Sequence, residues 1–295
     1  MKHFIVYLKE KSIHTPRLAV VRFLLALGML LTMLFNNLNI IANHNYTRLP
    51  GYTIRHSPAH YRPFQSADIF MVMAPEKARV VVIIILLLVM SGLLPQLTCL
   101  LHAWASFSIY NYFIIQNGGD HLTFALVLLL LPICLTDTRL NQWKWKQCPP
   151  SQRNIISNIA LCAIWMQASW VYLDAGYSKL FTKQWRDGTA VYYYTSHYRL
   201  GAPGWLRHIN EWVTLSQLVR VASWGTLLLE LLLALCIFFP SRIKVKFILP
   251  AIAFHFLIVI NFGLFTFFIA MIAMLLLYLD DNDRIALFIT RPKNE

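Results

Sequence analysis

The chain has 295 residues, of which 58% are hydrophobic and only 13% are charged, and its mean hydropathy is +0.54. A soluble domain of this length cannot bury so much apolar surface in its own core. The net charge of +13 does not indicate nucleic acid as a partner, because the basic residues flank apolar blocks instead of forming one stripe. The blocks are too long for barrel strands and lack two-residue alternation. The composition therefore predicts an all-α, polytopic integral membrane helix bundle whose first partner is the lipid bilayer.

Apolar blocks along the chain predict about eight transmembrane helices and no soluble domain, so residues 1–295 are expected to form one transmembrane domain. The first block is long enough to span a bilayer, which takes about 20 residues, and we interpret it as a retained helix and not as a signal peptide. Two blocks are shorter than a full span, which leaves seven or nine spans open. The predicted helices lie near residues 18–41, 78–95, 97–115, 121–136, 155–178, 214–239, 246–261 and 264–279.

Basic residues lie close to the helix ends on one side of this arrangement, and the positive-inside rule assigns that side to the cytoplasm. Both termini are then cytoplasmic in a multi-pass protein of the plasma membrane. The outer side receives the loops 42–77 and 179–213 and the short connection 116–121, and prolines make 50–77 a stiff, irregular loop. The cytoplasmic basic residues are Lys2, Lys9, Lys11, Arg17, Arg139, Lys144, Lys146, Arg153, Arg242, Lys244, Lys246, Arg284, Arg291 and Lys293.

Ionisable side chains inside apolar segments are costly in lipid, so each is a candidate for function. Arg22 lies one turn inside the first helix, and its long stem is expected to reach the headgroups. An ordinary interhelical hydrogen bond accounts for His102. The five cysteines form no CxxC motif and indicate neither a disulfide framework nor a metal site; they are Cys99, Cys134, Cys148, Cys162 and Cys236.

The segment Gly118-Gly119-Asp120-His121 places an acid at the start of a predicted helix. An acid there can cap the free N–H groups of the first turn, which is a structural role. Asp120 and His121 can equally form a polar wall of an outward-facing cavity. Both interpretations stay open.

The segment from Tyr172 to Leu180 is the sharpest local signal. Asp174 and Ser178 share one helical face, and Lys179 follows about 140° round the helix. A lysine in an apolar pocket can act as a base or nucleophile near neutral pH. A lysine that extends to the headgroups is the alternative.

Glu230 and His255 lie in the middle of two apolar blocks without a charged neighbour in sequence. Each must be neutral or find a partner in space. A direct pair between them satisfies both and is also a proton-relay arrangement.

Taken together, motifs along most of the chain resemble the sporulation-delaying protein B family of antimicrobial-peptide systems. The matching residues are Arg22 to Gly28, Leu31-Thr32, Gly118-Gly119-Asp120, Leu131 to Asp137, Arg139, Trp143, Gln167, Tyr172, Ala175, Lys179, Trp185, Gly188-Thr189-Ala190, Tyr192-Tyr193, Glu230, His255 and Gly263. That family is similar in turn to the HTTM superfamily, which includes the transmembrane domain of vitamin-K-dependent γ-glutamyl carboxylase. The similar segment here is Ala175 to Leu180 with Trp185 and Gly188.

The resemblance implies an HTTM-like topology and a role in maturing a secreted peptide toxin, together with a small partner protein of the same system. In the carboxylase, the lysine at the position of Lys179 deprotonates a quinone cofactor, so a quinone is the cofactor that the resemblance implies. The chain is less than half as long as the carboxylase and lacks its luminal domain, which argues against glutamate carboxylation. We expect Lys179, Asp120, Glu230 and His255 to carry the chemistry. The substrate-binding candidates are His121, Asp174, Tyr172, Trp185, Tyr192 and Tyr193.

Two other functions are alternatives to a role in toxin maturation. In one, the protein is a quinone- or lipid-dependent membrane enzyme in which aromatics such as Tyr172 and Trp185 face a ring, although an interfacial aromatic belt also explains them. In the other, it is a non-enzymatic export or immunity protein in which Glu230 and His255 stabilise helix packing or move protons. The absence of a clear internal repeat argues against a transporter.

Overall fold

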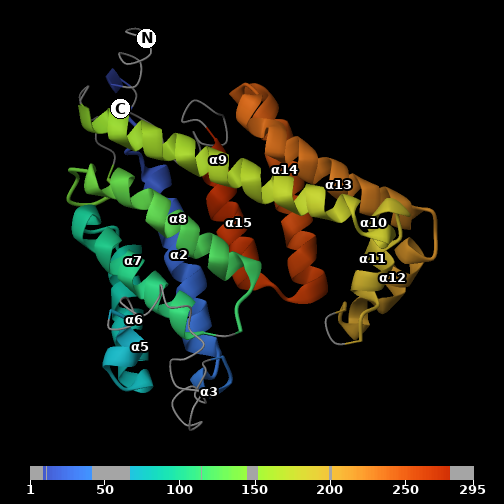
Figure 1. Cartoon of the computed structure of the whole chain (residues 1–295), viewed down its shortest axis with the longest axis horizontal. Coiled ribbons are helices and arrows are strands. Elements are labelled where there is room, and N and C mark those ends of the chain that lie inside the picture. Colours follow the sequence, from blue (N-terminus) through green and yellow to red (C-terminus); the bar gives the residue numbers. More distant parts are fainter. Residues whose placement is uncertain are drawn as a thin grey trace. The chain divides into compact units, whose positions relative to one another are not determined.

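The computed structural model describes residues 9–10, 12–41, 67–113, 115–144, 152–198 and 201–279. These residues are mostly helical, and no strand occurs among them (Figure 1). The predicted all-α class is therefore confirmed. The helices are α2 (Pro16–Phe35), α3 (Leu38–Ile41), α5 (Ile69–Val72), α6 (Pro75–Met90), α7 (Pro95–Tyr112), α8 (Gly118–Leu135), α9 (Gln152–Leu180), α10 (Lys183–Arg186), α11 (Ala190–Thr195), η3 (Gly204–Leu206), α12 (Arg207–Thr214), α13 (Leu218–Leu235), η4 (Cys236–Phe238), α14 (Ser241–Phe262) and α15 (Phe265–Tyr278).

Five of the described helices are long and apolar enough to cross a membrane, which makes the chain a multi-pass membrane protein. Each of the eight predicted blocks contains a helix, but α6, α7 and α15 are shorter or less apolar than these five. The count of eight spans therefore stays a prediction. The five spans are Pro16–Phe35, Gly118–Leu135, Gln152–Leu180, Leu218–Phe238 and Ile243–Phe262.

Helix boundaries differ from the predicted ones where proline or asparagine intervenes. Helices α6 and α7 begin earlier than expected, with Pro75 and Pro95 at their first positions, where a missing N–H has no cost. The first block is not one helix to residue 41, because Asn36 is extended at φ −102° and ψ 144° and ends α2. Of the predicted loop 50–77, residues 50–66 lie outside the described residues, and α5 and the start of α6 occupy much of the rest.

The chain divides into two compact units, Met1–Leu161 with Ile269–Ala273, and Cys162–Phe268 with Met274–Glu295. Each is considered by itself below, and the expectation of a single domain stays a prediction. In the first unit α7 packs against α8 and α6, while α2 packs against α6 and α8. The short helix α5 joins them through Phe70, whose ring stacks on Tyr112 at 4.5 Å between centroids.

The turn between α6 and α7 holds the segment that follows α8. Gly92 has φ +71°, and a Cβ there would lie 2.6 Å from Trp143 Cδ1, so only glycine fits. The N–H of Gln142 donates to the Gly92 carbonyl at 2.9 Å, and the N–H of Leu94 donates to Leu140 at 2.9 Å. Residues far apart in sequence are thus fixed beside each other at one end of the helices.

In the second unit α13 packs against α14, and α10, α11 and α12 all contact α13. Figure 1 shows these three short helices gathered at one end of α13. The predicted loop 179–213 is therefore largely helical. Helix α14 ends at Gly263, which adopts φ +70° and donates its N–H to Val259 at 2.7 Å, a left-handed C-terminal cap.

Candidate functional site

Lys179 and Glu230 form an ion pair within the second unit. Lys179 lies in the last turn of α9, and its Nζ donates to both carboxylate oxygens of Glu230, at 2.8 and 2.7 Å. The third ammonium hydrogen bonds the carbonyl of Ala175 at 3.1 Å. The side chain of Glu230 is only 7% exposed and that of Lys179 is 19% exposed. The ammonium therefore uses all three of its donors, and Lys179 points inward and not to the headgroups.

A glycine lets the two helices of this pair approach each other. Gly176 is buried on α9, and a Cβ added there would lie 2.9 Å from Leu231 Cδ2 and 3.6 Å from Glu230 Cβ. No side chain separates the helices at this point. Glu230, one residue before Leu231, therefore reaches Lys179, which lies about one turn after Gly176.

Trp185 covers the ion pair from the segment that follows α9. The ring centroid of this buried side chain lies 5.2 Å from Lys179 Nζ, within range of a cation–π interaction. The segment is fixed to α13 because Trp224 Nε1 donates to the carbonyl of Arg186 at 3.2 Å. Gly188, at φ +74°, provides the turn into α11.

A second hydrogen-bonded pair, Tyr172 and His255, joins α9 to α14. The Tyr172 hydroxyl and His255 Nε2 lie 3.1 Å apart, and both side chains are buried. The imidazole contacts Phe254 and Phe267, with ring centroids at 5.0 and 5.6 Å. Its Nδ1 is buried and has no hydrogen-bond partner among the described residues. A buried imidazole nitrogen left in this state is costly and needs an explanation.

The two pairs share helix α9, which carries both Lys179 and Tyr172. The direct Glu230–His255 pair suggested by the sequence is wrong, because each group has another partner. The arrangement is instead two parallel links from α9, one to α13 and one to α14.

The other candidates of the second unit lie at its surface. Asp174, Tyr192 and Tyr193 are exposed, and the two tyrosine rings meet edge to face at 5.4 Å. Among the described residues, none of these three forms a hydrogen bond, ion pair or ring contact with Lys179 or Glu230. Their role in binding a substrate stays a prediction.

Asp120 and His121 belong to the first unit. Asp120 and Asn117 form a capping box at the start of α8: Asp120 Oδ2 accepts the N–H of Asn117 at 2.8 Å, and Asn117 Oδ1 accepts that of Gly119 at 2.7 Å. His121 is exposed and meets the Tyr110 ring edge to face at 5.3 Å. The capping role of Asp120 is therefore present, while its predicted part in a cavity with Lys179 stays untested.

Two proteins of Bacillus subtilis (strain 168) are similar to this chain over most of its length. The uncharacterised protein YitO is 29% identical over 292 residues, which cover 96% of this chain and 91% of YitO. The sporulation-delaying protein SdpB is 28% identical over 263 residues, covering 88% of this chain and 80% of SdpB. The resemblance to the SdpB-like family that the sequence motifs indicate is therefore supported by this similarity. No family model matches the sequence, and no solved structure matches it.

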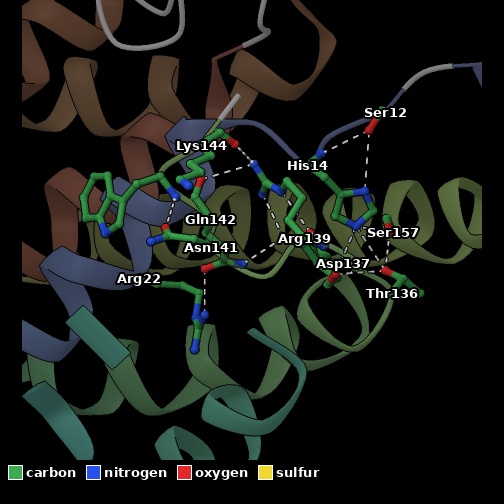
Figure 2. A network of polar contacts seen from close by, with 12 residues as sticks. Ser12, His14, Arg22, Thr136, Asp137, Arg139, Asn141, Gln142, Lys144 and Ser157 are labelled. Carbon is green, nitrogen blue, oxygen red and sulfur yellow. Dashed lines mark hydrogen bonds and ion pairs between the residues drawn. The ribbon is translucent and has the colours of Figure 1, made fainter. Parts of the chain in front are cut away.

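The SdpB-like chain also contains a polar network in its first unit, which Figure 2 shows. Asp137 receives two hydrogen bonds from the side chain of Arg139, from Nε at 2.9 Å and from Nη2 at 2.7 Å. Gln142 donates to Asp137 at 3.0 Å and accepts from Arg22 at 2.6 Å, and Arg22 also donates to Thr98 at 3.0 Å. Burial raises the pKa of Asp137, but the hydrogen bonds and charge of Arg139 outweigh it and hold the pKa below its ordinary value.

The expectation that the side chain of Arg22 reaches the headgroups is wrong. Arg22 is only 1% exposed and bonds inward, because Gln142 and Thr98 satisfy it inside the unit. The feature of the sequence that could have indicated this network is the pair Asp137 and Arg139, which lie two residues apart directly after an apolar helix. Arg22, which reaches Asp137 through Gln142, lies more than a hundred residues earlier, so sequence alone could not join them.

His14 extends the network toward α9. Its Nε2 lies 3.1 Å from the Ile133 carbonyl and 3.3 Å from the hydroxyls of both Thr136 and Ser157, which are 2.6 Å from each other. Burial lowers the pKa of His14 below its ordinary value of 6.5. These contacts fasten the residues before α2 to α8 and α9, which is a structural role.

Proposed function

We propose that this SdpB-like protein takes part in the maturation of a secreted antimicrobial peptide, and that Lys179 and Glu230 are the side chains that carry out its chemistry. The observation that carries the proposal is the buried Lys179–Glu230 ion pair between two membrane-spanning helices. Ionisable groups at such positions are expensive, and replacing a buried pair by apolar residues often costs nothing in stability. The name of the relative SdpB, a sporulation-delaying protein, supports the link to a toxin system.

The pair can supply a base by moving one proton. A lysine abstracts a proton only as the neutral amine, and Lys179 reaches that form by transferring a proton from Nζ to the Glu230 carboxylate across 2.7 Å. The amine can then take a proton from a substrate, and the Trp185 ring at 5.2 Å stabilises the ammonium that forms. Tyr172 and His255 can pass a further proton between α9 and α14.

The proposal places this site on the outer side of the plasma membrane, with both termini in the cytoplasm. The support is the distribution of Lys and Arg, which puts the end of α9 outside. A peptide precursor that has crossed the membrane would meet the site there, together with the small partner protein of the system. Asp120, His121, Asp174, Tyr192 and Tyr193 are proposed as outer-face contacts of such a substrate.

A quinone-dependent reaction of HTTM type is a second candidate, and the aromatic surroundings of Lys179 favour it. Trp185 lies against Lys179 and Tyr172 against His255, and His255 Nδ1 offers a hydrogen bond that no described residue takes. When bound, a quinone supplies two-electron redox chemistry. Lys179 would hold or release the proton at Nζ, and Glu230 would receive it. Purified protein without bound quinone and without any quinone-dependent change would contradict this candidate.

One experiment separates maturation from export and immunity. The gene is deleted in its own organism, and the covalent structure of the toxin peptide is determined by mass spectrometry inside and outside the cells. Maturation predicts an unprocessed or unmodified precursor, both in the deletion and in a Lys179→Ala strain with normal protein levels. Mature peptide retained inside the cells would instead indicate export, and mature secreted peptide that kills its producer would indicate immunity; either result overturns the proposal. A Glu211→Gln strain is the control, because the side chain of Glu211 is exposed and pairs with Arg207 and His208 of its own helix.

A further inference from the structure

Helix α12 presents large apolar side chains to the outside of the second unit. Trp205, Ile209 and Trp212 follow one another at spacings of four and three residues, so they form one stripe along the helix and the turn before it. Their exposed fractions are 71%, 58% and 70%. Such a continuous exposed stripe indicates a surface that something else covers.

The other sides of α12 are occupied differently. Asn210 donates to Asn261 Oδ1 at 3.0 Å, and Thr214 is buried, so this side faces the protein. Arg207 and Glu211 form an exposed ion pair at 2.7 Å, and His208 lies beside them. The helix therefore has three sectors, one toward the unit, one charged and one apolar.

Contacts fix the level of α12 at the ends of two spans, α13 and α14. Helix α13 begins at Leu218, only four residues after α12 ends, and Asn210 bonds Asn261 in the last turn of α14. Figure 1 shows α10, α11 and α12 together at one end of α13. A helix held at this level lies where the hydrocarbon of the bilayer gives way to headgroups.

We infer that α12 is an interfacial helix whose Trp205–Ile209–Trp212 stripe is covered by the lipid bilayer at the boundary of headgroups and acyl chains. Tryptophan prefers this boundary, because its ring is apolar and its N–H can bond to headgroups. Separate charged and apolar sectors are the pattern of helices that lie in the membrane surface. The charged residues Arg207, His208 and Glu211 then face water and headgroups.

This placement has a consequence for the neighbouring helices. Because α12 contacts α11 and α13, it holds the segment after Trp185 at the membrane surface. A ligand that reaches Lys179 from this side arrives along the lipid surface. The inference concerns the bilayer alone and does not depend on the toxin-maturation proposal.

The test uses the full-length protein, with its native cysteines replaced, in vesicles of phosphatidylcholine with phosphatidylglycerol. Nitroxide labels are placed singly at positions 205, 209 and 212, and as matched controls at 207 and 208. Interfacial helices bury their apolar face about 5–10 Å deep, so we expect the ratio of oxygen to nickel-chelate accessibility to be at least about threefold higher on the stripe than on the controls. Equal nickel accessibility on both faces, or exclusion of both reagents from the stripe by protein, would overturn the inference.

A second measurement needs no label and keeps the test valid if a labelled variant misfolds. Brominated lipids quench tryptophan that touches acyl chains, so Trp212→Phe should remove a quenched component from the emission of the unlabelled protein. Trp185→Phe is the control, because Trp185 is buried within the unit and should contribute no component that brominated lipid quenches. If the fluorescence lost with Trp212 is not quenched by brominated lipid, the stripe does not lie in the bilayer.

Discussion

Lys179 has no unsatisfied hydrogen-bond donor in this structure, and this determines how it can work. Two of its ammonium hydrogens bond Glu230 and one bonds Ala175. A substrate must therefore compete with Glu230 for the ammonium of Lys179, or a proton must first move from Lys179 Nζ to the Glu230 carboxylate. Both routes make the carboxylate as necessary as the lysine.

A double-mutant cycle separates the contribution of the Lys179–Glu230 pair to the reaction from its contribution to the stability of the protein. Lys179→Met or Glu230→Leu alone leaves an unpaired buried charge and should cost about 3–5 kcal/mol, while the double variant should recover much of that loss. Thermal unfolding in detergent measures the three variants. Maturation of the peptide should fail in all three, including the stable double variant. A double variant that is both stable and active would show that the pair is only structural.

The buried His14 gives the first unit a pH dependence of known sign. Because burial lowers its pKa below 6.5, the unfolded chain takes up a proton that the folded protein does not, and the stability falls as the pH drops below 6.5. Above that pH the contribution is constant. Asp137 acts only at lower pH, since its pKa lies below the ordinary 3.8.

His14→Gln should flatten the decline in unfolding temperature between pH 7 and pH 5 relative to the unsubstituted protein. His208→Gln should leave the slope unchanged, because the His208 side chain is 95% exposed. Equal slopes in all three proteins would show that His14 does not couple protonation to folding.

At the scale of the element, short segments between the spans position the site. Gly188 adopts φ +74°, and a Cβ there would approach the backbone of Arg220 on α13 to 3.2 Å. The turn therefore attaches the segment with Trp185 to the same helix that carries Glu230. The sequence alone marks these residues as a loop on the outer side, because the long-range contact with α13 leaves no local signal.

Gly188→Ala should loosen this attachment, because an alanine at positive φ costs about 1–2 kcal/mol before any clash is counted. We expect a lower unfolding temperature and faster tryptic cleavage after residues 183 and 186. Gly204→Ala is the matched control, since no atom lies within 4 Å of the Cβ it would add and its φ is ordinary. The attachment would be unimportant if the two variants behaved alike.

Helix content was predictable from apolar block length, and the helices α8, α9, α13 and α14 lie close to their expected ranges. The break at Asn36 was missed, because hydropathy does not register one extended residue. Glu230 and His255 were recognised as groups that need partners, but periodicity cannot name a partner on another helix. Their real partners, Lys179 and Tyr172, became visible only when α9 was placed against α13 and α14.

At the scale of the whole molecule, five described helices establish a multi-pass membrane protein, while its orientation is a prediction from the distribution of Lys and Arg. With native cysteines replaced, Tyr193→Cys should react with a membrane-impermeant maleimide in intact cells. Lys144→Cys should react only after the membrane is opened. Labelling of Lys144→Cys alone in intact cells would invert the topology and move the Lys179–Glu230 pair to the cytoplasmic side.

The most direct test of the central claim is the mass of the toxin peptide made by a strain whose only copy of this gene carries Glu230→Gln. The amide keeps the size and one hydrogen bond of the carboxylate but cannot take the proton from Lys179 Nζ. With normal amounts of the variant in the membrane, the account predicts precursor peptide in place of the mature form. Mature peptide at unchanged yield would contradict it.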